Sequence, residues 1–171
     1  YENAKKIYLN YVDELNGEQL NKLGFCYWSG DEFELALYYF KIASEQGDEW
    51  GTYNTAFNYY HGKGTTKNLQ KTYEYLIKLK NSTTFKNYDE YYHLLGHCFE
   101  NMKDDDGKPD YIQAIINFEK SANLGNSDSM LHLGDYYNNS GKITTNKEKA
   151  KDWYKKACDT GNKDACNKYV Y

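Results

Sequence analysis

Two histidines of the chain, His93 and His97, are spaced by four residues, and Cys98 follows them directly. Imidazoles at this spacing lie on one face of a helix, where they can bind a metal ion together. The glutamate of an H-E-x-x-H motif is missing between them, and the sequence fixes no third ligand. We therefore expect a polar stretch of a binding surface here, and we expect neither a metal nor a cofactor.

The acidic segment Asp104 to Asp110, which reads DDDGKPD, invites comparison with a calcium loop. An EF-hand loop carries acidic residues at positions one, three and five, glycine at six and glutamate at twelve. With Gly107 as the sixth residue, Met102 falls at the first position and Gln113 at the twelfth, so the motif fails. The segment instead predicts a solvated loop in which Asp110 caps the next helix.

Other kinds of functional site find little support in the composition. The sequence has no G-x-S-x-G, S-x-x-K or phosphate-binding glycine loop, and we expect no enzyme. The net charge is −4 without a basic cluster, which argues against nucleic acid as a partner. No run of 18 apolar residues is present, so we expect no membrane insertion.

The elements that would position such residues follow a repeat. Four segments carry a small residue and, three residues later, an aromatic residue. The small positions lie 32, 40 and 38 residues apart. They are Gly24, Ala56, Gly96 and Gly134, and their aromatic partners are Tyr27, Tyr59, Phe99 and Tyr137.

A second motif follows each of the first ones at helical spacing. Its small positions are Ala36, Thr72, Ala114 and Ala150, and the large residues four positions later are Phe40, Leu76, Phe118 and Tyr154. Glycine inside a helix costs about 1 kcal/mol relative to alanine, so the repeated glycine needs a structural reason. We predict a close approach of the two helices of a hairpin there, with the alanine-type position as the matching socket.

Helix start and stop signals agree with these hairpins. Asn68, Asp110 and Asn146 are predicted N-caps, each four residues before the small position of its second helix. Asp31 is predicted to cap the second helix of the first repeat from one residue earlier. Left-handed helix ends are expected at Gly47, Gly125 and Gly161, and Asp48, Asp128 and Asp164 favour the next helix start. The expected helices are 2–15, 18–29, 32–46, 48–61, 68–80, 88–101, 110–124, 127–139, 147–160 and 163–169.

The pattern predicts an all-α fold, a right-handed α-solenoid of stacked helix–turn–helix repeats. A single hairpin cannot bury its apolar face alone, so neighbouring hairpins are expected to share one core and form a single solenoid domain over 1–171. Its parts are a truncated repeat helix at 1–16, four repeats at 17–47, 48–83, 87–125 and 126–161, and the start of a further repeat or cap at 162–171.

Residues 18–166 resemble the Sel-one-like repeat family, a relative of the tetratricopeptide repeats. The last repeat carries the closest pattern: Leu133, Gly134, Tyr137, Ile143, Asn146, Lys149, Ala150, Trp153, Tyr154, Lys156, Ala157 and Gly161. Gly62 and Gly64 form the G-x-G loop of the second repeat. The first repeat lacks this loop, and the third replaces it with the acidic segment. The resemblance implies an α-solenoid that works by binding other proteins.

The cysteines divide into two groups. Cys158 and Cys166 span the turn between two repeats, which resembles the pairs that form disulfides in cysteine-rich Sel-one-like proteins secreted by bacteria. We expect this disulfide if the protein matures outside the cytosol. Cys26 and Cys98 follow the repeated glycine by two residues, and we expect both to be buried thiols. Without a C-x-x-C motif, structural zinc is not expected.

We expect the chain to bind another protein or peptide in a concave groove lined by the first helix of each repeat. The favoured role is a bacterial adaptor of the envelope, periplasmic or secreted. The alternative is an immunity protein that neutralises a cognate toxin, cytoplasmic if that toxin is cytosolic; an enzyme is a remote third. The expected partner-binding residues are Asn21, Phe25, Trp28, Trp50, Tyr53, Phe57, Tyr60, His93, His97, Glu100, Leu131, Asp135 and Asn138.

Overall fold

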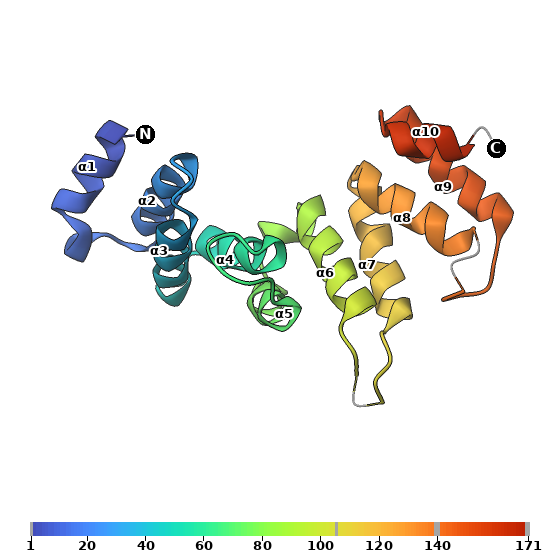
Figure 1. Cartoon of the computed structure of the whole chain (residues 1–171), viewed down its shortest axis with the longest axis horizontal. Helices are drawn as coiled ribbons and strands as arrows, with labels where there is room; N and C mark the ends of the chain where they lie inside the picture. Colours follow the sequence, from blue (N-terminus) through green and yellow to red (C-terminus); the bar gives the residue numbers. More distant parts are fainter. Residues whose placement is uncertain (1, 105, 139–140, 170–171) are drawn as a thin grey trace. The chain divides into compact units, whose positions relative to one another are not determined.

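The computed structural model describes residues 2–104, 106–138 and 141–169, and all regular elements in these ranges are helical. The all-α solenoid of helix–turn–helix repeats that the sequence predicts is confirmed. The chain divides into two compact units, residues 1–83 and 84–171. Whether they form one domain stays a prediction, and each unit is described by itself (Figure 1).

The first unit holds α1 to α5, of which α2 and α3 form one hairpin and α4 and α5 the next. Its core gathers Leu23, Tyr27 and Phe40 with other buried side chains of α2 and α3. Lys5 of α1 forms an ion pair with Glu32 at the start of α3. The elements are α1 (Glu2–Asn10), the 3₁₀ turn η1 (Val12–Glu14), α2 (Gly17–Ser29), α3 (Phe33–Glu45), α4 (Glu49–His61) and α5 (Leu69–Lys78).

The second unit holds α6 to α10, in which α6 pairs with α7, α8 with α9, and α10 packs on α9. Phe118, Leu133 and Tyr136 lie at the centre of a buried cluster contributed by α7 to α10. The elements are the 3₁₀ turn η2 (Phe85–Asn87), α6 (Asp89–Asn101), α7 (Tyr111–Asn123), α8 (Ser127–Tyr137), α9 (Lys147–Asp159) and α10 (Lys163–Tyr169).

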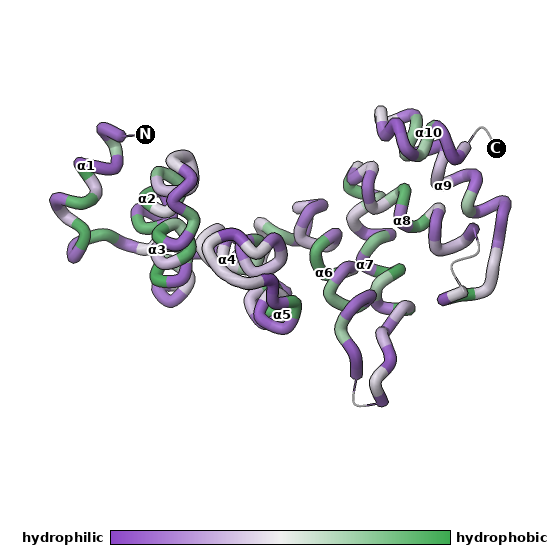
Figure 2. Tube along the Cα trace, viewed as in Figure 1, coloured by the Kyte–Doolittle hydropathy of each residue, from purple (hydrophilic) through white to green (hydrophobic). Residues whose placement is uncertain are grey.

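Hydrophobic and hydrophilic residues alternate along most of the helical traces, for example α3 and α7 (Figure 2). The repeated glycine position is a point of close approach, as predicted. A Cβ added to Gly96 would lie 2.6 Å from the Phe118 ring, and one added to Gly134 would lie 2.4 Å from the Tyr154 ring. The nearest neighbour is thus the large residue of the second helix, so the alanine-type socket proposed from the sequence is wrong: the glycine accommodates the ring itself.

Most of the expected caps are present. The side chains of Asn68, Asp110 and Asn146 accept hydrogen bonds from backbone N–H groups three residues later, at 2.9, 2.9 and 3.0 Å. The expected glycines at the ends of the second helices have φ values of +84° at Gly47, +107° at Gly125 and +96° at Gly161. These left-handed residues end the helices and turn the chain toward the next repeat.

Three local expectations need correction. Asp31 is no N-cap: it lies in the left-handed region at φ 58°, and Glu32 precedes α3 without a side-chain cap. The first expected helix breaks at Tyr11, whose φ of −130° is not helical, and continues as a 3₁₀ turn. The sequence Asn-Tyr-Val at this break has low helix propensity. Helix α8 ends at Tyr137, and position 139 of its expected range lies outside the described residues.

The acidic segment forms a loop organised by its first carboxylate. Asp104 Oδ1 accepts hydrogen bonds from the backbone N–H groups of Asp106 at 3.0 Å and Lys108 at 2.8 Å. Asp105 lies outside the described residues. Among the described helices, none is both long enough and apolar enough to span a membrane.

Candidate functional site

In the first unit, rings from α2 and α4 contact one another at the surface. The Trp28 ring lies edge-on to Phe33, with centroids 4.8 Å apart, and edge-on to Phe57 at 5.9 Å. The register of the hairpins explains this meeting, because Trp28 and Phe57 stand four residues and one residue after the small position of their helices. We call Phe25, Trp28, Trp50 and Phe57 the aromatic face.

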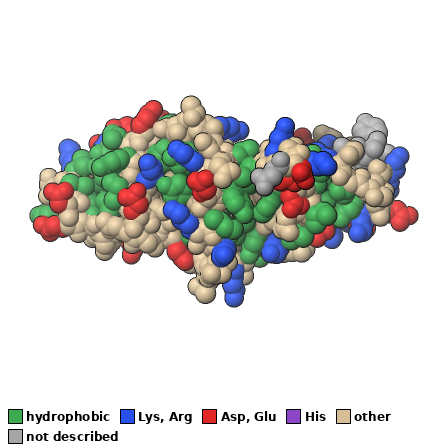
Figure 3. Space-filling view, turned by 90° about the horizontal axis from the view of Figure 1, so that it is seen from below, with side chains coloured by type: hydrophobic (Ala, Val, Ile, Leu, Met, Phe, Trp, Pro, Cys, Tyr) green, Lys and Arg blue, Asp and Glu red, His purple; other side chains and the backbone are tan. Residues whose placement is uncertain are grey.

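The aromatic face combines exposed and packed rings. Phe25 is 42% exposed and Trp50 is 39% exposed, whereas Trp28 and Phe57 are half-buried. The Phe25 ring is held edge-on to the buried Phe40 at 5.3 Å. Figure 3 shows one side of the molecule, on which hydrophobic side chains reach the surface between lysines and carboxylates. Exposed rings that are fixed by neighbouring rings are suited to binding another surface.

Tyr60 extends this surface at the C-terminal end of α4. It is half-buried, its ring lies edge-on to His61 at 4.8 Å, and Lys67 Nζ lies 5.5 Å from its centroid. The ammonium group and the tyrosine ring place a polar rim beside the apolar rings.

Two expected contact residues of the first unit are buried instead. Asn21 is 7% exposed, and its Oδ1 accepts a 2.9 Å hydrogen bond from Asn54 Nδ2 of α4. Tyr53 is 4% exposed and lies 6.0 Å from Trp50 and 6.4 Å from Phe57, measured between ring centroids. These side chains leave little surface for a partner, so direct contact is not supported for either. Asn21 joins α2 to α4, and Tyr53 packs against Trp50 and Phe57, two rings of the aromatic face.

In the second unit, the expected residues His93, His97 and Glu100 lie along one side of α6. Glu100 forms an ion pair with Lys142 at 2.6 Å, and its other carboxylate oxygen lies 3.3 Å from His97 Nδ1. Burial alone would raise the pKa of Glu100, but hydrogen bonds from His97 and Lys142 and the charge of Lys142 outweigh it and hold the pKa at about 2. Glu100 is therefore a permanent anion beside the histidines.

The structure adds a residue that the sequence reasoning missed. His132 of α8 faces His93 and His97, and one ring nitrogen from each of the three lies within 4.8 Å of the others. The sequence held a signal for it, since the chain has four histidines and His132 occupies the first helix of the following repeat. The earlier objection to a metal site, the missing third ligand, is therefore removed.

The remaining expected residues lie on α8 and its C-terminal end. Leu131 is half-buried and packs on the core of the second unit. Asp135 accepts hydrogen bonds from Tyr154 Oη at 2.7 Å and from Lys168 Nζ at 2.5 Å. Burial, then the bond to Asp135, raise the pKa of Tyr154, which stays a neutral donor.

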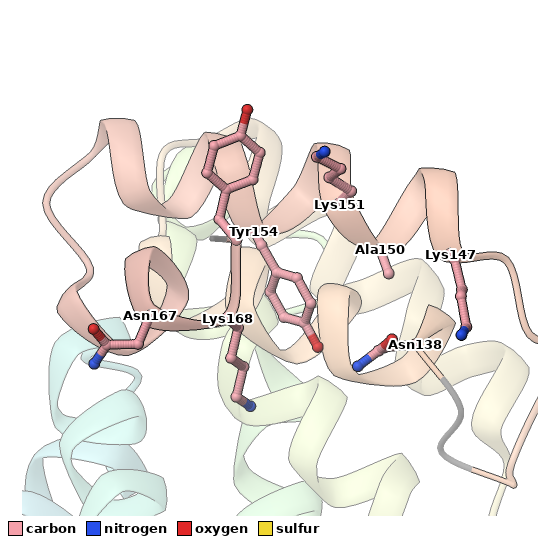
Figure 4. Close-up of a pocket in the computed structure, with 8 residues that line it drawn as sticks. Asn138, Lys147, Ala150, Lys151, Tyr154, Asn167 and Lys168 are labelled. Carbon is pink, nitrogen blue, oxygen red and sulfur yellow. The ribbon is translucent and has the colours of Figure 1, made fainter. Parts of the chain in front are cut away.

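Asn138 lines a hollow of about 580 Å³ between α8, α9 and α10 (Figure 4). Lysines from α9 and α10 surround this hollow together with Tyr154 and Tyr169. Lys151 Nζ lies 5.6 Å from the Tyr169 ring, and Lys168 is engaged by Asp135. The cations of this hollow are thus partly neutralised, and it offers a polar surface next to Asn138.

The cysteines occupy the places expected for them. Cys158 and Cys166 form a disulfide across the turn from α9 to α10, with Cα atoms 4.6 Å apart. Cys26 and Cys98 are buried thiols outside the disulfide, 5% and 0% exposed. Burial raises the pKa of the Cys98 thiol to about 12, so it is protonated and unreactive in the folded protein.

Comparison with known proteins identifies one protein family. The sequence model of the Sel1 repeat family matches residues 20–48, 51–81, 90–126 and 127–162. These four matches fall on the hairpins α2–α3, α4–α5, α6–α7 and α8–α9. No curated protein matches the chain.

Three solved structures of similar fold are bacterial proteins. A protective antigen present in uropathogenic Escherichia coli strains, displaying an SLR fold, matches 96% of this chain at 23% identity and a TM-score of 0.79. A Sel1 repeat protein from Oxalobacter formigenes matches 90% at 20% identity and a TM-score of 0.72. A putative sel1 repeat protein from Klebsiella pneumoniae matches 99% at 18% identity and a TM-score of 0.57. The chain spans 35%, 62% and 84% of these structures, respectively.

Proposed function

The chain belongs to the Sel1 repeat family, and we propose that it is a non-catalytic adaptor whose aromatic face binds a partner protein. Sel1 repeats generally mediate protein–protein interaction. The observation that carries the proposal is the group of exposed rings on α2 and α4, with Phe25 and Trp50 the most accessible.

The packing of the rings favours binding energetically. A side chain that becomes ordered on binding loses about 0.5–1.5 kcal/mol of conformational freedom. Phe25 and Trp28 already have their ring planes fixed by Phe40 and Phe33. The rings therefore lose most of this freedom when the protein folds, before any partner binds. The apolar area that a partner covers then contributes directly to affinity.

The compartment belongs to the same proposal: a bacterial envelope, periplasmic or secreted protein. A disulfide between Cys158 and Cys166 is suited to an oxidising compartment. The three similar structures compared above are bacterial, and one of them is described as a protective antigen. Intact mass of the protein from its native host, alkylated with and without reductant, tests the proposal. Two free thiols at these positions would contradict it.

Affinity capture with matched variants tests the binding surface. The bait is compared with its Phe25→Ala and Trp50→Ala variants and with a control, Tyr38→Ala. Tyr38 is an exposed aromatic residue of the same unit, 56% exposed, but it lies on the second helix α3. We expect a partner that is retained by the wild type and by Tyr38→Ala and is depleted with both variants of the aromatic face. Equal retention by all four proteins would contradict the proposal.

The identity of the captured partner separates the two roles. An envelope or secreted protein without toxic activity supports the adaptor. A toxin whose activity the chain blocks at equimolar concentration would instead establish the immunity alternative. The same variants would then test whether the aromatic face binds the toxin.

A further inference from the structure

Three of the four histidines of the chain converge on one point of the second unit. His93 and His97 are one turn apart on α6, and His132 reaches them from α8. The ring centroids lie 4.7 Å apart for His93 and His97, 4.7 Å for His97 and His132, and 5.7 Å for His93 and His132. The folding of the second unit thus brings His132 of α8 into one cluster with His93 and His97 of α6.

The repeat fold does not require histidine at these positions. The residues that correspond to His97 in the first two repeats are Phe25 and Phe57, and the residue that corresponds to His132 in the third repeat is Leu94. Other side chains fill these repeat positions elsewhere in the chain, so the helices form and pack without imidazoles there.

The surroundings hold two of the imidazoles in the form that binds metal. His93 Nδ1 lies 2.8 Å from Ser129 Oγ, and that hydroxyl donates in turn to Ser121 Oγ at 2.8 Å. Since the Ser129 proton is used there, His93 Nδ1–H is the donor, and the lone pair is on Nε2. His97 Nδ1 faces Glu100 Oε2 at 3.3 Å, which favours the same tautomer. Metal-bound histidines commonly have their second nitrogen held by a hydroxyl, carbonyl or carboxylate in this way.

The third imidazole is fixed by stacking. The His132 ring stacks on the buried Phe118, with centroids 5.1 Å apart and planes 19° from parallel. The stack fixes the plane of the His132 ring beside His97, with the two imidazole centroids 4.7 Å apart.

We propose that His93, His97 and His132 form a binding site for a divalent transition-metal ion, with Zn²⁺ as the ion. Three imidazoles match the preference of Zn²⁺, Ni²⁺, Co²⁺ and Cu²⁺ and not that of Mg²⁺ or Ca²⁺, which take oxygen ligands. Nitrogens bound at about 2.0–2.1 Å to a tetrahedral ion are closer together than 4.8 Å, so the rings must close on the ion by small side-chain rotations.

The site leaves one position of a tetrahedral ion for water or for a ligand from a partner. Zinc would also link α6 to α8, two helices of successive repeats, and would stabilise the second unit when it binds. This proposal is independent of the aromatic face, which lies in the first unit, so the failure of either leaves the other unaffected.

Calorimetric titration of the full chain, free of any histidine tag, with Zn²⁺ tests the site. We expect one ion per chain at micromolar affinity or tighter. The variants His97→Asn and His132→Asn should each weaken binding at least about tenfold. The control His61→Asn, which removes the fourth histidine, should bind like the wild type. No saturable binding at millimolar Zn²⁺, or equal binding by His132→Asn, would overturn the proposal, and titration with Mg²⁺ should give no signal.

A second measurement needs no variant and is unaffected by misfolding. In ¹⁵N-resolved spectra of the histidine rings, Zn²⁺ should shift the signals of three rings and leave that of His61 in place. Shifts of all four, or of none, would contradict a site made by the three clustered residues.

Discussion

At the scale of single residues, the repeat depends on a glycine that faces a large ring. A Cβ on Gly24 would lie 2.6 Å from two carbons of the Phe40 ring, and Phe40 is 1% exposed. Phe40 has no room to move away because the surrounding core is close-packed. The second repeat has the complementary pair: Ala56 takes the glycine position and the smaller Leu76 takes the ring position.

A double-mutant cycle tests this complementarity. Gly24→Ala should destabilise the protein by up to about 2 kcal/mol, because overpacking costs about 1–3 kcal/mol and the better helix propensity of alanine returns about 1 kcal/mol. Combining it with Phe40→Leu, which reproduces the pair of the second repeat, should cost less than the sum of the single changes. Urea unfolding of the four proteins measures the coupling. Additive effects would show that the two side chains do not compete for space.

The cysteines give a second prediction at this scale. Cys26 and Cys98 are buried thiols, and the pKa of Cys98 is raised to about 12 by burial. Alkylation of the oxidised native protein at pH 8 should therefore add no label. Unfolding should expose two thiols, and unfolding with reductant should expose four. Mass spectrometry counts the labels, and rapid labelling of the native protein would contradict the burial of these side chains.

At the scale of elements, the second helices α5, α7 and α9 each begin at a side chain that caps the helix. Asn146 Oδ1 accepts a 3.0 Å hydrogen bond from Lys149 N at the start of α9. Asn146→Ala should cost about 1 kcal/mol of stability, since an N–H group of the first turn loses its partner. Asn146→Asp restores the acceptor that Asp110 provides in the preceding repeat and should unfold like the wild type. Chemical denaturation measures both. An unaltered midpoint for Asn146→Ala would contradict the role of the cap.

Local signals in the sequence correctly predicted most of the helix caps and turns, because these features depend only on residues within one hairpin. Caps at Asn68, Asp110 and Asn146 and left-handed glycines at Gly47 and Gly125 need only a few residues to form. Asp31 was misassigned because a left-handed aspartate and an N-capping aspartate both occur in short turns, and the sequence does not distinguish them.

Features that depend on packing between hairpins were beyond the sequence. The burial of Asn21 follows from its hydrogen bond to Asn54 on another helix. The histidine cluster likewise depends on how α8 packs beside α6, so spacing along the chain revealed only His93 and His97. The positions of the rings in the repeat led us to expect exposed rings on α2 and α4. Tyr53 is buried instead, because a position in the repeat does not specify how deeply neighbouring side chains cover a residue.

At the scale of the whole molecule, the sequence predicts one solenoid domain, and cooperativity of unfolding tests it. Trp28 and Trp50 report on residues 1–83 and Trp153 on residues 84–171. The variant Trp153→Phe and the double variant Trp28→Phe, Trp50→Phe therefore isolate the two signals. We expect their urea midpoints to coincide after correction for the effect of each substitution on stability, measured by circular dichroism. Two separate transitions would show that the units fold independently.

The central claim, that the aromatic face binds a partner protein, is tested most directly by the dissociation constant of the complex. Once a partner is captured, calorimetry compares the wild type with Phe25→Ala and Trp50→Ala and with the control Tyr38→Ala. Loss of an anchoring ring costs about 1–3 kcal/mol, which corresponds to an increase in Kd of about 5- to 150-fold. The account predicts increases of this size for the two variants of the aromatic face and no change for Tyr38→Ala. Unchanged Kd values for Phe25→Ala and Trp50→Ala, with all proteins folded, would contradict it.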